Sequence, residues 1–139
     1  MGDWKTGYFV KACIFRNRLE ILDTGKARLI GINGPENSIP DFRPAGAGAV
    51  ISSDHPLAYM DVFLVKDRIY GLYSGKIDRK VLEQGRRETS LLVFKRSGEI
   101  ESHLVLGIPI SSFTVDEEGN RIIGVTADRE PGLVVFDLN

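Results

Sequence analysis

The sequence predicts an all-β protein, specifically a partial β-propeller of about two and a half to three four-stranded antiparallel blades. Its apolar runs are short and rich in β-branched and aromatic residues, which favours strands over helices. Polar turns, most of them containing glycine, separate these runs. The pattern also recurs, because Leu91 and Leu133 begin matching segments 42 residues apart, close to the roughly 40 to 45 residues of a propeller blade.

The repeat consists of matching strands in the same order. Residues 68–75 read RIYGLYSG and residues 121–128 read RIIGVTAD, and each segment follows an apolar run and a polar turn. The next strand reads LLVF at 91–94 and LVVF at 133–136, and a third copy, LEIL, lies at 19–22. Glycine-containing turns and further strands follow two of these copies, as in β-hairpins. A Greek-key sandwich gives no reason for such a repeat.

The whole chain forms one domain in this interpretation. It comprises strands at 8–31, a loop at 33–58, a full blade at 59–107 and a last blade at 110–138. We expect the first unit to lack its first strand and the last unit to lack its fourth. A charged insertion at 76–88 separates the second and third strands of the full blade. Irregular insertions on a regular frame are common places for binding functions.

Strand alternation and the repeat positions predict which side chains are buried between neighbouring sheets. The expected core comprises Ile69, Leu72, Val93, Phe94, Phe113, Val115, Ile122, Val135 and Phe136. Cys13 is the only cysteine and lies in an apolar run, so we expect a buried structural thiol rather than a disulfide partner.

The charge balance excludes a strong electrostatic field around the chain. Eighteen basic and nineteen acidic side chains give a net charge of −1, so no overall field recruits nucleic acid or an anionic membrane. No apolar stretch approaches the roughly 18 residues of a membrane span. The N-terminal residues also lack the apolar region of a signal peptide. We therefore expect no nucleic-acid partner, no membrane span and no signal peptide in this chain.

The repeat landmarks resemble a known family. They are Tyr59-x-Asp61, RIYGLYSG at 68–75, LVF at 92–94, the run from Phe113 to Glu117, and RIIG at 121–124. These motifs look like the bacterial TolB-like six-bladed β-propeller proteins, of which this chain would be the C-terminal part. The resemblance covers residues 59–138 well and residues 8–31 more weakly. It implies a fold rather than a chemistry, together with a non-enzymatic role in the cell envelope or periplasm.

Three acidic residues are weak candidates for a metal site. Asp61, Asp116 and Glu117 lie at strand or turn positions near an expected propeller axis, and hard cations prefer several oxygen ligands. The turn after Asp116 needs polar residues in any case, which is the simpler explanation. Neither His55 nor His103 shows metal-ligand spacing. We therefore expect neither a metal nor a cofactor.

Other motifs also have simpler structural explanations. Ser52, Ser53 and His55 lack the Gly-x-Ser-x-Gly turn of a hydrolase nucleophile. The pair Gly46-x-Gly48 lacks the third glycine and the helix of a phosphate loop. The basic residues of the charged insertion, which acidic neighbours dilute, are Lys76, Arg79, Lys80, Arg86 and Arg87. No residue is therefore assigned a catalytic role.

The sequence favours a non-catalytic binding or scaffold module of a bacterial envelope protein, which contacts an unknown protein or saccharide ligand through its loops. The alternative is a metal-dependent hydrolase or lactonase of propeller type. Incomplete terminal units leave strand edges and apolar sheet faces exposed. We therefore expect self-association, or pairing with the missing blades.

Overall fold

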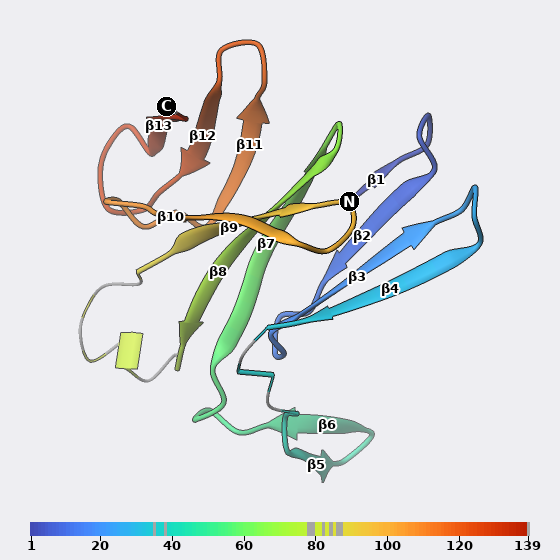
Figure 1. Cartoon of the computed structure of the whole chain (residues 1–139). Helices are drawn as coiled ribbons and strands as arrows, with labels where there is room; N and C mark the ends of the chain where they lie inside the picture. Colours follow the sequence, from blue (N-terminus) through green and yellow to red (C-terminus); the bar gives the residue numbers. More distant parts are fainter. Residues whose placement is uncertain are drawn as a thin grey trace.

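The computed structural model describes residues 1–34, 36–37, 39–77, 80–81, 83, 85 and 88–138. Its strands form four antiparallel sheets, which confirms the predicted all-β class. Three of the sheets stand next to one another in chain order, and the fourth is a two-stranded hairpin that projects from them (Figure 1). The described strands form an open stack, and no closed ring is present among them.

Consecutive strands pair with each other in every sheet. The first sheet contains β1 (Gly2–Asp3), β2 (Tyr8–Ala12), β3 (Arg18–Asp23) and β4 (Arg28–Asn33). The middle sheet contains β7 (Leu57–Val65), β8 (Arg68–Lys76), β9 (Ser90–Lys95) and β10 (Ile100–Val105). The last sheet contains β11 (Ser112–Asp116), β12 (Arg121–Val125) and β13 (Leu133–Asp137). The hairpin arm consists of β5 (Phe42–Ala45) and β6 (Gly48–Ile51).

The first sheet has one strand more than the sequence predicts. Gly2 pairs with Phe9 and Asp3 with Tyr8, so the short strand β1 completes a four-stranded sheet. The prediction that the first unit lacks its first strand is therefore wrong. A strand of two residues is too short to show the alternation from which strands are predicted. The last sheet has three strands in the described part of the chain, as predicted.

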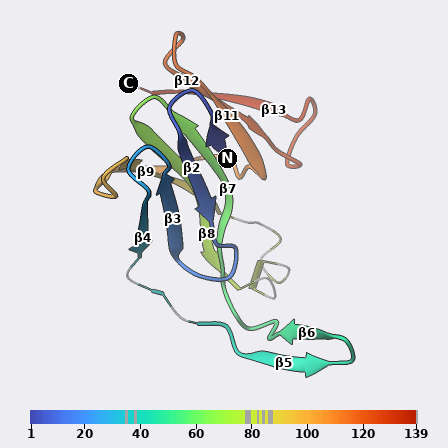
Figure 2. The ribbon, with the colours of Figure 1, turned by 90° about the vertical axis from the view of Figure 1, so that its right-hand side faces the viewer.

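The connection predicted as a loop at 33–58 contains the hairpin arm, so this prediction is also wrong. Figure 2 shows the arm extending away from the stacked sheets. Ala45 pairs with Gly48 across a two-residue turn, and Gly46 supplies a φ of 60° at its first central position. Glycine adopts this conformation without steric cost, which is why tight hairpin turns favour it. Pro44 and the small residues around it hide the arm's strand pattern in the sequence.

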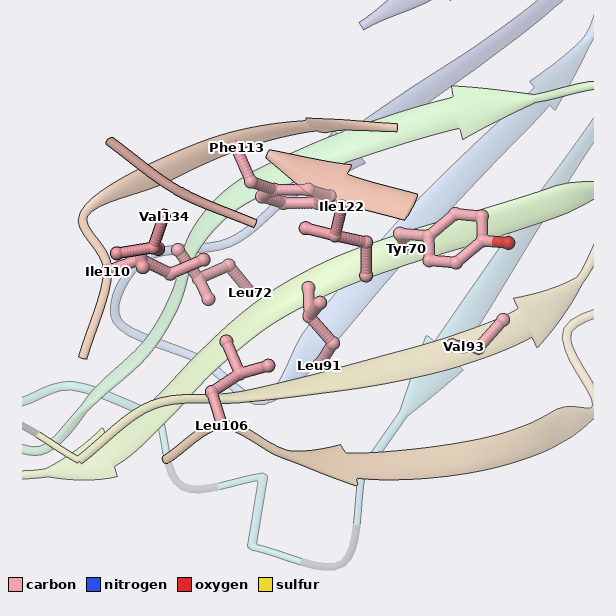
Figure 3. Packing of buried hydrophobic residues seen from close by; sticks show 9 residues of the cluster. All are labelled: Tyr70, Leu72, Leu91, Val93, Leu106, Ile110, Phe113, Ile122 and Val134. Atoms are coloured by element: carbon pink, nitrogen blue, oxygen red, sulfur yellow. The ribbon is translucent and has the colours of Figure 1, made fainter. Parts of the chain in front are cut away.

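Two hydrophobic clusters fill the spaces between the stacked sheets. The cluster between the middle and last sheets, drawn in Figure 3, contains Tyr70, Leu72, Leu91, Val93, Leu106, Ile110, Phe113, Ile122 and Val134. The cluster between the first and middle sheets contains Val10, Leu19, Ile21, Ala58, Tyr59, Leu64, Ile69 and Phe94. The middle sheet is therefore covered on both faces, whereas the first and last sheets are each covered on one.

Most of the predicted core is confirmed. The buried members are Ile69, Leu72, Val93, Phe94, Phe113 and Ile122. Val115 and Phe136 are half-buried and pack against the cluster between the middle and last sheets. Val135 is the error, since 57% of it is exposed. Its neighbour Val134 points toward the middle sheet, so Val135 points the other way, where no sheet of the described chain lies.

The charged insertion follows β8. Its described residues include Lys80 and Val81, which have helical backbone, and the Val81 amide donates to the Ile77 carbonyl at 3.2 Å. In the described part of the chain, no helix is long and apolar enough to cross a membrane.

Candidate interaction surface

The three acidic metal candidates each have a structural partner. Asp61, on β7, accepts the Phe113 amide at 3.3 Å and so links the middle sheet to the last. Asp116 accepts the Gly119 amide at 3.0 Å, and its other oxygen lies 2.5 Å from the Arg121 guanidinium. Glu117 forms an ion pair with Lys66 across the two sheets.

These carboxylates do not meet at one point. Asp61 contacts the start of β11 and Asp116 ends that strand, three residues later, a distance of roughly 10 Å at the usual strand rise. The described residues contain no group of three His, Cys, Asp or Glu side chains that could hold a metal ion. Hydrogen bonds from Arg121 lower the pKa of Asp116, and the hydrogen bond to Glu117 raises the pKa of Lys66. Both effects are those of ordinary structural ion pairs.

The serine and histidine cluster forms a turn beside the hairpin arm. The Nε2 atom of His55 lies 2.5 Å from the Phe15 carbonyl oxygen, so the ring is directed at backbone. The Ser52 hydroxyl oxygen accepts the Asp54 amide at 3.3 Å. This is the local bonding of a polar turn, in which serine and aspartate are commonly found. The shallow hollow beside it, of about 350 Å³, is also lined by Ser53.

The charged insertion can be followed only in part. Lys76 lies 2.7 Å from Glu88, so its charge is paired. The prediction for Arg79, Arg86 and Arg87 lies outside the described residues. Cys13 is a free thiol and is half-buried, less deeply than predicted.

A groove of about 540 Å³ lies between the first and middle sheets. Asn17 is 4% exposed there and donates to the Tyr73 hydroxyl at 3.3 Å. Burial raises the pKa of Tyr73, which keeps the hydroxyl neutral. The Oδ1 atom of Asn17 and the hydroxyl of Ser74 are buried without a partner among the described atoms. The groove therefore offers polar groups, but its lysine is held by Glu88 at the rim.

The outward side of the last sheet is the most distinctive surface. Each of the three stacked sheets has two cross-strand pairs at equivalent positions. They are Leu19–Ala12 and Ile21–Val10 in the first sheet, and Leu91–Leu72 and Val93–Tyr70 in the middle sheet. In the last sheet they are Leu133–Val125 and Val135–Ile123. In the first and middle sheets these side chains form the intersheet clusters. In the last sheet they face outward, with Leu133 60% and Val125 43% exposed.

We call these four residues of the last sheet, Ile123, Val125, Leu133 and Val135, the last-sheet face. They are adjacent, because both pairs lie on the same side of β12 and β13. Large exposed apolar patches commonly mark binding surfaces. The edge strand β13 borders this face and pairs, in the described chain, with β12 alone. A groove of about 580 Å³ follows the other side of this edge, between β10 and β13.

The outward side of the first sheet has a different chemistry. We call its central residues, Phe9, Lys11, Glu20 and Leu22, the first-sheet face. Glu20 bonds Lys11 at 3.3 Å and Arg18 at 3.0 Å. These hydrogen bonds, that of Arg18 foremost, lower the pKa of Glu20. The first-sheet face therefore carries ionised groups at its centre.

The equivalent positions in the other sheets show how unusual those charges are. The pair Lys11–Glu20 corresponds to Gly71–Leu92 in the middle sheet and Gly124–Val134 in the last. Glycine is needed at the first of these positions, because a side chain from a neighbouring segment lies over it. A Cβ atom would come within 2.8 Å of the Tyr59 ring at Gly71, and within 2.7 Å of Ile110 at Gly124.

The sequence predicts exposed apolar faces on incomplete terminal units, but it places Val135 in the core because LVVF at 133–136 repeats the largely buried LLVF at 91–94. No protein-family model, curated protein or solved structure matches the chain.

Proposed function

We propose that the chain is a non-catalytic binding or scaffold module, a partial six-bladed propeller of the TolB-like kind from a bacterial cell envelope. It acts by receiving another β-sheet protein on the last-sheet face. The observation that carries this proposal is the exposure of Val125, Leu133 and Val135 at positions that are otherwise part of the intersheet core. The first and middle sheets bury these positions against the next sheet, and the last sheet exposes them, so its face is suited to packing against a further sheet.

The acidic residues support a non-catalytic role. Asp61, Asp116 and Glu117 hold backbone amides or cationic side chains of neighbouring strands. An acid or base in catalysis needs access to a substrate, whereas these groups connect sheets and close turns. The module therefore uses its carboxylates to fix its structure.

The proposal is tested by the accessibility of a thiol on the last-sheet face. Cys13 is first replaced by serine, and Val135→Cys is compared with Leu29→Cys, which lies on the outward side of the first sheet. The two positions are 57% and 65% exposed, so their intrinsic labelling should be similar. We expect maleimide to label Val135→Cys at least tenfold more slowly in concentrated purified protein or in a lysate of the encoding organism than in dilute purified protein. Leu29→Cys should react equally under all three conditions. Equal labelling of Val135→Cys under all three conditions would contradict the proposal.

A further inference from the structure

We propose that the sheet received on the last-sheet face is the last sheet of a second copy of this chain, in a two-fold dimer. This inference rests on the proposed function and names its partner. A two-fold interface uses the same patch on both subunits, so the patch must complement itself. The last-sheet face meets this requirement, since Ile123, Val125, Leu133 and Val135 are all apolar.

The shape of the face suits packing against another sheet. Strands β11, β12 and β13 pair in continuous register, without the irregularities seen between β7 and β8 or between β9 and β10. A regular sheet presents its outward side chains in even rows, and two such sheets pack face to face at about 10 Å. Branched side chains such as Leu133 and Val135 interdigitate well in this arrangement.

The charges of the last sheet lie away from the centre of this face. Asp116 and Arg121 pair at one end of β11 and β12, and Asp137 lies at the same end of β13. The pair Ile123–Val135 at the middle of the β12–β13 ladder and the pair Val125–Leu133 at its other end carry no charge. Beyond that end, Arg129 donates to the Leu133 carbonyl at 3.3 Å, so charges flank the apolar residues at both ends. A second copy therefore covers the apolar centre while the charged residues remain at the rim, as in most stable protein interfaces.

The first-sheet face is a poorer partner for the same surface. A head-to-tail assembly would press Leu133 and Val135 of one copy against Glu20 and Lys11 of the next. Glu20 and its partner Arg18 are only 27% and 24% exposed already, and Lys11 is 70% exposed. Removing the remaining water from these charges is unfavourable, whereas burying apolar groups is favourable. The two-fold contact between last sheets avoids this cost.

The first experiment measures the oligomeric state by sedimentation velocity from 1 to about 100 µM. We expect the natural chain to dimerise in the micromolar range, and Val135→Lys to weaken dimerisation at least tenfold, because it buries a charge against its own copy. Leu29→Lys is the matched control, since it adds the same charge at a similarly exposed strand position. A monomer throughout this range, or equal weakening by both variants, would overturn the proposal.

The second experiment identifies the contacting faces by oxidation of single-cysteine variants, with Cys13 replaced by serine. We expect Leu133→Cys or Val135→Cys to form homodimers linked by a disulfide, while Leu29→Cys does not. A disulfide formed only in a mixture of Val135→Cys and Leu29→Cys would indicate head-to-tail assembly and overturn the two-fold dimer. A purified monomer whose Val135→Cys is still protected in the lysate would mean that a different protein covers the face. In that case the proposed function stands and the second-copy inference fails.

Discussion

The third strands of the middle and last sheets have nearly the same sequence and very different surroundings. Leu91 and Val93 of β9 are fully buried or nearly so, while Leu133 and Val135 of β13 are 60% and 57% exposed. The alternation along the two strands is the same, and so is the pairing with the preceding strand. The difference comes entirely from whether another sheet covers them. Burial is therefore a property of the neighbour as well as of the strand.

The second strands of these two sheets show the same dependence on neighbouring strands, in this case for an arginine. Arg68 of β8 bonds Glu101 at 2.8 and 3.0 Å, a partner on the fourth strand of its sheet. Arg121 holds the equivalent place in β12, where the described chain has no fourth strand, and bonds Asp116 instead. Arginines at equivalent positions of the repeat therefore form ion pairs with different partners, depending on which strands their sheet contains.

The largest effect is expected from truncating the equivalent leucines. Leu91→Ala removes a fully buried side chain and should lower the free energy of unfolding by about 2 to 5 kcal/mol. Leu133→Ala removes a largely exposed one and should change it by under about 0.5 kcal/mol. Chemical denaturation well below 1 µM, under the concentration at which we expect dimerisation, measures the monomer and gives both values. Similar losses in the two variants would mean that the last-sheet face is covered within the monomer.

A smaller effect is expected at the glycines covered by neighbouring side chains. Gly71→Ala and Gly124→Ala place a methyl group against buried Tyr59 and Ile110, and each should cost about 1 to 3 kcal/mol. Lys11→Ala, at the equivalent place in the first sheet, should cost less than about 1 kcal/mol, because it removes only an exposed ion pair. Thermal unfolding of the three variants checks the order. A stabilised Gly124→Ala would show that Ile110 moves aside freely.

The smallest effect concerns the ion pair at the end of the last sheet. Its hydrogen bonds with Arg121 hold the pKa of Asp116 below its ordinary value. A lowered pKa stabilises the fold above about pH 4, where the unfolded carboxylate is ionised, and this contribution is lost as the pH falls through the lowered pKa. The natural chain should therefore exceed Arg121→Gln in stability at pH 6, by a margin that shrinks below about pH 4.

Denaturation midpoints between pH 6 and pH 2.5 provide the measurement. Leu133→Ala is a suitable control from the same sheet, since it changes no charge and its difference from the natural chain should not depend on pH. A margin for Arg121→Gln that grows as the pH falls would show that Arg121 stabilises the fold through some group other than Asp116.

The sequence by itself determined most of the strands and their order. Short β-branched runs, glycine turns and the 42-residue repeat are local signals, and they predicted the strands of the middle and last sheets and a core that includes Ile69, Leu72 and Phe94. Alternation also predicted two faces for every strand. It could not reveal β1, which is too short to alternate, or the hairpin arm, whose strand pattern is hidden by Pro44 and the small residues around it.

Tertiary structure decided which faces are covered. Val93 and Val135 are indistinguishable in a sequence pattern, because the pattern records only that one side of each strand is apolar. Whether that side is buried depends on a sheet contributed by residues distant in the chain, or by another molecule. The same reason explains the role of Asp61. Its position in the sequence suggested a metal ligand, but in the structure it accepts the Phe113 amide and so links the middle sheet to the last. The partner of each side chain is set by the packing of the sheets, a long-range property that local patterns do not carry.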